Sequence, residues 1–221
     1  MSLATNRLLQ LKAALDFVVA GTDTTSTTSE WAMAEIMRKI QDELDDVVGK
    51  NSTVEELHIP KLHCLDAVVK ENLRLHLVAP LLLPRHPSKS CYVARYTIPE
   101  GAQVLVNAWG IHRDPEAWDN PLEFHPESFL TKNGKWDYSG NNFHYFPFGT
   151  GRRICAGIPL AKRLLPYVLA SLLHLFERRF ADGTEIDMLE KTGITLKKMI
   201  PLVVVPKPRL LLEKYGYWFC G

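Results

Sequence analysis

A single cysteine stands between a glycine-rich turn and the start of a predicted helix. Cys155 follows Gly149 and Gly151 and precedes Gly157. At the start of a helix, unpaired backbone N–H groups and the helix dipole favour a negative charge. A cysteine in that position, with Arg152 close by, is predicted to ionise easily. This position therefore favours a stabilised thiolate at the end of a turn.

The residues around Cys155 favour one of the possible roles of such a thiolate over the others. A nucleophile, a redox sensor and a metal ligand all use a stabilised thiolate, and a buried structural cysteine is the plain alternative. The glycines leave room for a large flat group, and Phe146 and Phe148 would shield that group from water. Arg153, two residues before the cysteine, suits a carboxylate on it. A haem, with its ring, iron and two propionates, meets these demands, and thiolate is an axial ligand that proteins use for haem iron.

The sequence around the cysteine also resembles a known family. Residues 148–157, FGTGRRICAG, match F-x-x-G-x-R-x-C-x-G and resemble the haem-binding loop of the cytochrome P-450 family, the haem-thiolate monooxygenases. Three further matches follow the family's order: residues 20–25 resemble its oxygen-activation motif, Glu71-x-x-Arg74 its E-x-x-R pair, and residues 124–129 the segment that packs on that pair. The resemblance covers about residues 10–208 and is similar to plant microsomal flavonoid and terpenoid hydroxylases.

The resemblance implies a set of site residues. Cys155 would be the axial ligand of the iron of haem b, while Thr24 donates a hydrogen bond and Asp23 relays protons during oxygen activation. Glu71 and Arg74 would form a buried structural pair. The other expected haem contacts are Ala20, Gly21, Arg85, His112, Phe148, Gly151, Arg153 and Gly157. From the residues alone, several of these positions have a plainer interpretation. They are a Thr-rich helix bend at Asp23 and Thr24, a surface ion pair at Glu71 and Arg74, a solvated arginine at Arg85 and a loop histidine at His112.

Hydrophobic spacing predicts helices over about residues 5–48, 62–76 and 155–179. A run of Thr and Ser at residues 22–29 interrupts the first of these, and it either ends the helix or distorts it through hydroxyl bonds to backbone carbonyls. Residues 80–106 predict a small antiparallel sheet and residues 112–154 a long functional loop. Residues 194–210 predict a final β-hairpin.

No linker divides the chain, so we expect one mixed unit. The expected fold is mainly α with small antiparallel β-sheets, the C-terminal half of the cytochrome P-450 fold. This partial domain would cover residues 1–208, followed by a divergent tail at residues 209–221.

Composition limits the partners and the compartment. The 221 residues are 46% hydrophobic and 23% charged, with a net charge of +1 and no Lys/Arg block, so nucleic acid is not an expected partner. The four cysteines are widely scattered and form no C-x-x-C pair, so a zinc or redox-dithiol site is not expected. A reducing compartment is expected rather than a disulfide scaffold. The N-terminus does not resemble a signal peptide, and the apolar runs are too short to anchor the chain in a membrane.

The resemblance supplies the remaining expected partners. They are a small apolar or phenolic substrate, O₂ and an NADPH–cytochrome P-450 reductase, so that NADPH acts only indirectly. Full-length relatives are expected at the cytosolic face of the endoplasmic reticulum membrane. This chain, without an anchor of its own, is expected in the cytosol.

Several features depart from the family pattern. The chain is about half the family's length, and residues 35–44 join two helices that the family separates by a turn. Ser128 replaces an arginine expected to complete the Glu71–Arg74 network, and Pro166 lies inside the last predicted helix, where a proline costs about 3 kcal/mol. These departures suggest a truncated, mispredicted or decayed copy that holds haem weakly. The alternatives to a monooxygenase are a non-catalytic remnant with at most haem binding, and a thiolate sensor or nucleophile without haem.

Overall fold

The computed structural model describes residues 3–35, 39–130, 136–179, 186–193 and 195–209, and within these ranges the chain is mainly helical. The helical elements are α1 (Leu3–Glu35), α2 (Lys39–Val47), the 3₁₀ turn η1 (Glu56–Lys61), α3 (His63–Leu75), α4 (Ala108–Ile111), α5 (Glu127–Leu130), the 3₁₀ turn η2 (Gly151–Arg153) and α6 (Ile158–Leu175). The strands are β1 (Cys91–Val93), β2 (Tyr96–Ile98), β3 (Phe176–Arg179), β4 (Glu190–Lys191), β5 (Lys197–Lys198) and β6 (Val205–Pro208).

The strands form small antiparallel ladders, as the sequence predicts, but one predicted pairing is wrong. β1 pairs with β2, and Arg85 forms a further antiparallel bridge with Val104. The expected hairpin within residues 194–210 does not form, because β5 pairs with β4 and β6 pairs with β3. β5 and β6 therefore pair with strands that precede them in the chain rather than with each other. The local alternation of apolar and polar residues does not indicate which strand is the partner.

The last helix is shorter than its hydrophobic spacing suggests. α6 begins at Ile158 and ends at Leu175, not over residues 155–179. The residues expected at its C-terminal end form β3, whose backbone pairs with β6. α6 continues through Pro166, which is buried, so the proline does not end the helix. Lys162, whose carbonyl would accept the missing N–H, is exposed, and water can take that place.

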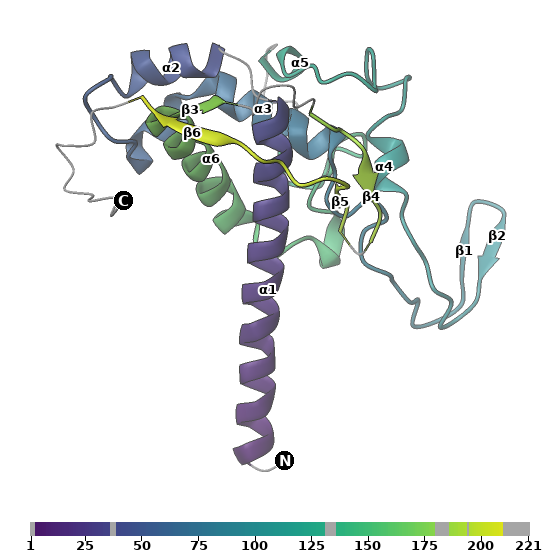
Figure 1. Cartoon of the computed structure of the whole chain (residues 1–221). Coiled ribbons are helices and arrows are strands. Elements are labelled where there is room, and N and C mark those ends of the chain that lie inside the picture. The colour runs from purple at the N-terminus through teal and green to yellow at the C-terminus, as the bar shows by residue number, and fades with distance from the viewer. Residues whose placement is uncertain (1–2, 36–38, 131–135, 180–185, 194, 210–221) are drawn as a thin grey trace.

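The Thr-rich stretch lies inside α1 and does not end it. The Thr24 hydroxyl donates to the Ala20 carbonyl at 2.7 Å, and the Thr28 hydroxyl donates to the Thr24 carbonyl at 2.8 Å. These bonds stay within the helix, so the hydroxyls do not draw the backbone out of it. The expected single helical stretch to residue 48 is instead two helices. α2 lies beside the C-terminal end of α1 and runs in a different direction (Figure 1), with residues 36–38 outside the described part of the chain.

The hydrophobic core gathers where α2, α3 and α6 meet the C-terminal half of α1. Its fully buried members include Leu44, Leu65, Leu169 and Leu173. α3 and α6 therefore support the loops that connect them. The N-terminal part of α1 extends away from this core (Figure 1), and Phe17 is 69% exposed there.

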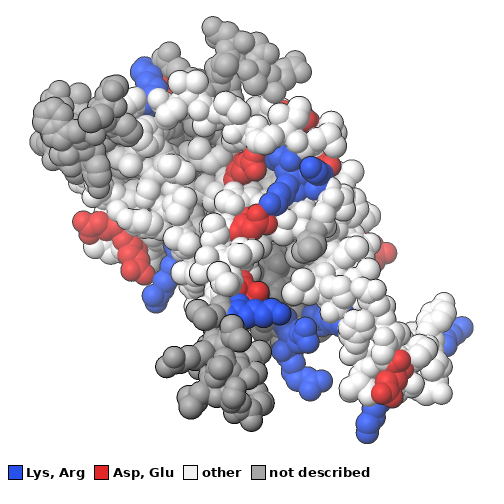
Figure 2. Space-filling view, turned by 60° about the horizontal axis from the view of Figure 1, so that its bottom comes forward, with Lys and Arg blue, Asp and Glu red and all other residues white. Residues whose placement is uncertain are grey.

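The surface carries no large area of one charge on the face that Figure 2 shows, where basic and acidic side chains are interspersed. Among the described residues, α6 is the one helix that is long and apolar enough to cross a membrane. A core helix of a soluble protein has the same length and composition, and Leu165, Leu169 and Leu173 of α6 belong to the core.

Candidate functional site

A cavity of about 670 Å³ lies between α1, the chain that follows α3, and the cysteine loop before α6. It brings together residues that the sequence analysis singled out from segments far apart in the chain. Those that line it are Ala20, Asp23, Thr24, Arg85, Phe148, Arg153 and Cys155. Gly21, His112, Gly151 and Gly157 do not line it, and Glu71 and Arg74 lie elsewhere in the core.

Two glycines turn the cysteine loop into the cavity wall. Gly149 has φ +74° and Gly151 has φ +66°, a region that other residues rarely adopt. The resulting turn lets the Cys155 N–H donate to the Phe148 carbonyl at 3.0 Å. Gly151 therefore shapes the loop without lining the cavity.

The Cys155 sulfur lies just before α6 rather than inside it. The N–H of Gly157, the residue that precedes the helix, donates to Sγ at 3.3 Å. A hydrogen bond from the backbone at a helix N-terminus stabilises a thiolate. The sulfur lines the cavity and the cysteine is exposed, so a ligand in the cavity has access to it.

Sequence analysis missed Gly140, which lies directly behind this loop. It has φ +73°, and a Cβ built on it would lie 2.7 Å from the Gly149 carbonyl oxygen. The Thr150 hydroxyl donates to the Gly140 carbonyl at 2.6 Å. The only local signal is the turn chemistry of residues 139–142, SGNN, which predicts a turn but not its contact with the cysteine loop.

We expect Gly140→Ala to displace the cysteine loop and weaken haem binding. The new methyl group would overlap backbone rather than a movable side chain, and positive φ adds about 1–2 kcal/mol of strain. Gly101→Ala is the matched control, because Gly101 has φ +74° but nothing within 4 Å of a built Cβ. Denaturant unfolding and haem titration of both variants would separate strain from overlap, and equal behaviour would contradict the role assigned to this contact.

α1 presents one face to the cavity. Ala20, Asp23 and Thr24 are three and four residues apart, so they share that face. Gly21 is turned away, and nothing lies within 4 Å of a Cβ built on it. The Asp23 carboxylate contacts the Lys197 ammonium at 2.5 Å, which no sequence motif indicated.

Two arginines supply the cavity's positive charge. Arg85 is fixed by its backbone bridge to Val104, with N–H···O distances of 3.0 and 2.8 Å. Its guanidinium passes close to Gly149, where a Cβ would lie 3.9 Å from Nη2. Arg153 reaches the cavity from the cysteine loop. No acidic partner within the described ranges forms an ion pair with either arginine, so both are available to an anionic group.

His112 lies outside the cavity, which differs from the direct haem contact expected for it. It is fully buried, and its Nε2 accepts a hydrogen bond from the Phe146 N–H at 3.0 Å. Burial, and then the charge of Arg74, lower the pKa of His112 to about 3, so the ring is neutral and suited to accept. His112 therefore holds the chain that leads into the cysteine loop.

Glu71 and Arg74 connect α3 to the chain that leads towards that loop. Arg74 donates from Nε and Nη2 to the two Glu71 oxygens at 2.7 and 2.8 Å, and both side chains are buried. It also donates to the carbonyls of His112, Pro121 and Glu123. The pair is thus a buried structural junction rather than a surface ion pair.

Ser128 does not leave this junction incomplete. Glu71 Oε1 also accepts from the His125 N–H at 2.6 Å, so both carboxylate oxygens have partners without the expected arginine. The Ser128 hydroxyl lies 3.4 Å from His125 Nδ1. The expected weakening of the charge network at Ser128 is therefore not what the contacts indicate.

The residues present fit a haem. The cavity combines a sulfur bonded by a backbone N–H, two arginines without acidic partners, and apolar walls that include Phe148, Ile154 and Leu165. A thiolate can ligate iron, arginines pair with propionates, and the apolar walls accept the ring.

Comparison with known proteins shows which family the chain matches. The family model described as cytochrome P450 matches residues 9–205. The chain is 47% identical over 212 residues to a flavonoid 3'-monooxygenase of Petunia hybrida and 49% identical over 201 residues to a geraniol 8-hydroxylase of Catharanthus roseus. These matches cover 91% and 87% of this chain but 41% and 40% of those relatives, so the chain spans about two fifths of their length.

Solved structures give the same result. A zebra fish cytochrome P450 in a structure with abiraterone superposes with a TM-score of 0.78 at 32% sequence identity. The match covers 88% of this chain and 46% of that one. The structure with progesterone gives the same TM-score and identity, with coverage of 87% and 45%. The described chain thus has part of that fold, with helices and small antiparallel ladders.

Proposed function

Since the chain belongs to the cytochrome P450 family, we propose that it is the haem-binding part of a haem-thiolate monooxygenase. Members of that family use haem b. The observation that carries the proposal is the cavity in which the Cys155 sulfur, the Arg85 and Arg153 side chains and the Thr24 face of α1 meet.

The residues that line the cavity would each have a separate role in holding the haem. A bound haem would supply the iron that activates O₂ with electrons that a reductase takes from NADPH. Cys155 would ligate that iron, with its sulfur oriented by the hydrogen bond from the Gly157 N–H. Arg85 and Arg153 would orient the propionates through planar, two-point contacts.

Proton supply would fall to α1. The Thr24 hydroxyl donates a hydrogen bond to the Ala20 carbonyl, so its hydrogen must rotate away from that carbonyl, about the Cβ–Oγ bond, to donate into the cavity. Positioned proton transfer contributes roughly 10²–10⁴ in rate. Asp23, in the same wall, would exchange protons with water.

The proposed substrate is a small apolar or phenolic molecule. The names of similar proteins specify flavonoid, geraniol and 7-ethoxycoumarin chemistry, and all three are compounds of this size and character. The apolar part of the cavity wall, including Leu77, Val78 and Leu82, suits such a compound. We further propose that a reductase supplies the electrons, which it takes from NADPH. Full-length relatives would contact that reductase at the surface of the endoplasmic reticulum.

A second candidate function is a non-catalytic chain with at most haem binding. It is favoured by the exposure of Cys155 and of apolar residues on α1, such as Phe17 at 69%. Catalysis of this kind requires water to be excluded. The test is the 221-residue chain reconstituted with haem and supplied with a reductase and NADPH. Sustained product from a phenolic or terpenoid substrate supports the monooxygenase, whereas bound haem without product supports the second function.

We expect Thr24→Val to uncouple electron use from product formation. Valine keeps the shape of threonine but has no proton to donate. In a chimera completed with the rest of a longer relative, NADPH consumption should continue while product per NADPH falls by at least about tenfold and peroxide rises.

The matched control is Thr27→Val, on the same helix. Thr27 is buried but does not line the cavity, so this variant should leave the ratio of product to NADPH unchanged. If Thr24→Val also leaves that ratio unchanged, the threonine serves only the helix, through its bond to Ala20.

A further inference from the structure

We propose that Lys197 neutralises Asp23 from outside the cavity, so that the cavity keeps the charge of two arginines for a dianionic tetrapyrrole. The inference rests on the proposed haem function. It assigns a task to a lysine that does not line the cavity and lies in none of the recognised motifs.

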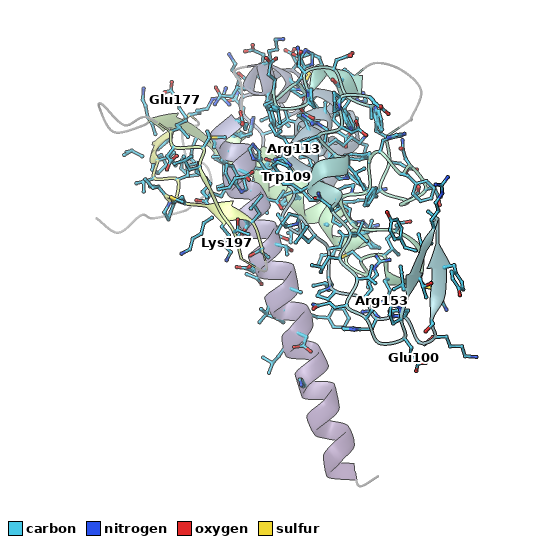
Figure 3. The ribbon with its side chains drawn as sticks, turned by 90° about the vertical axis from the view of Figure 1, so that its right-hand side faces the viewer. Glu100, Trp109, Arg113, Arg153, Glu177 and Lys197 are labelled. Carbon is cyan, nitrogen blue, oxygen red and sulfur yellow. The ribbon has the colours of Figure 1, made fainter. Side chains whose placement is uncertain are left out.

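The contacts hold the Asp23 carboxylate at both oxygens. Lys197 Nζ lies 2.5 Å from Oδ1, and the Thr195 hydroxyl donates to Oδ2 at 3.3 Å. Lys197 begins β5 and is 174 positions from Asp23, so the end of the fold reaches back to α1. Figure 3 shows Lys197 beside α1, whereas Arg153 lies in the loop on the other side of that helix.

The charges of the lining explain why this pair matters. Apart from Cys155, whose sulfur would face the iron, Asp23 is the one acid among the described residues that line the cavity, and Arg85 and Arg153 are the bases. An uncompensated Asp23 would offset one arginine and repel the two propionates of a haem. Lys197 removes that repulsion, although the pair is 45% and 40% exposed and adds little stability to the fold.

The position of Lys197 does not depend on the ion pair alone. The Leu196 N–H donates to the Val78 carbonyl at 2.8 Å, and the β4–β5 ladder pairs Lys191 with Lys197. These backbone bonds do not involve the Lys197 side chain, so β5 stays paired with β4 but is held less firmly when that side chain is changed. Lys197→Met should therefore fold and leave Asp23 in place with its charge uncompensated.

The test is spectrophotometric titration of the haem-free chain with ferric protohaem and with its dimethyl ester. Lys197→Met should weaken protohaem binding about threefold to tenfold, the effect of one charge at roughly 10 Å in a partly solvated site. Asp23→Asn, alone or combined with Lys197→Met, should bind at least as tightly as the unsubstituted chain. Lys197→Arg should retain the affinity, and the ester, which lacks the propionate charges, should not bind more weakly to Lys197→Met.

Lys207→Met is the control for a lost surface ion pair. Lys207 pairs with Glu177 on the β3–β6 ladder, and both side chains are about half exposed and outside the cavity. Its affinity for protohaem should be unchanged. The proposal is overturned if Lys197→Met weakens binding as much in the Asp23→Asn background as alone, or if the ester is affected as strongly as protohaem.

Hydrogen exchange of the haem-free chain tests the ion pair separately. Lys197→Met and Asp23→Asn should each speed exchange in β5, and the charge-swapped double variant, Asp23→Lys with Lys197→Asp, should restore protection. Unchanged exchange in both single variants overturns the pairing. Failure of every variant to bind protohaem would contradict the proposed function instead, and the exchange result would still decide the ion pair.

Discussion

Arg74→Met is expected to prevent the chain from folding. Arg74 is 1% exposed and gives its donors to Glu71 and to the carbonyls of His112, Pro121 and Glu123. Methionine fills part of the space but leaves the buried Glu71 carboxylate without its charge partner, which costs about 3–5 kcal/mol. The three carbonyls each lose a partner as well, so the total approaches the whole stability of a small domain, about 5–15 kcal/mol.

Lys70→Met is the matched control for that change. It removes a lysine from the same helix, whose i,i+4 pair with Asp66 at 2.7 Å is partly exposed, so less than about 1 kcal/mol is expected. Glu71→Leu combined with Arg74→Met should recover part of the loss, because no buried charge then remains. Urea unfolding of the soluble fraction measures all three, and equal midpoints for Arg74→Met and Lys70→Met would refute the role of the junction.

Cys155→His is expected to abolish thiolate ligation of haem while leaving the loop folded. The Cys155 side chain is exposed, and the backbone bond from its N–H to the Phe148 carbonyl does not involve the sulfur. The low-spin signal typical of a ferric haem thiolate in electron paramagnetic resonance should disappear completely. Cys91→Ser, at the exposed cysteine of β1, should retain it. A thiolate signal that persists in Cys155→His would assign the ligand to another cysteine.

The parts of the site that follow from short stretches of sequence could be predicted. The glycines around Cys155 specify a turn, and the structure has positive φ at Gly149 and Gly151. The three- and four-residue spacing on α1 predicts that Ala20 and Thr24 share a face, and both line the cavity. Glu71 and Arg74 are three apart on one helix, so their contact also follows from local geometry.

The parts that depend on distant contacts could not be predicted. The Asp23–Lys197 pair and the β3–β6 ladder join residues that are far apart in the chain, and nothing in their local sequence identifies the partner. Similarly, the sequence predicts that His112 lies in a loop and contacts the haem. In the structure its buried ring instead accepts a hydrogen bond from the Phe146 N–H. Gly140 resembles any turn glycine until the Gly149 carbonyl is placed against it.

The central claim is that Cys155 ligates a haem in the cavity between α1 and the cysteine loop. The most direct measurement is the absorption spectrum of the unsubstituted chain, reconstituted with haem, reduced and exposed to carbon monoxide. The account predicts the strongly red-shifted Soret band of a thiolate-ligated carbonyl complex. A band at the position typical of histidine-ligated haem, or no complex at all, would contradict it.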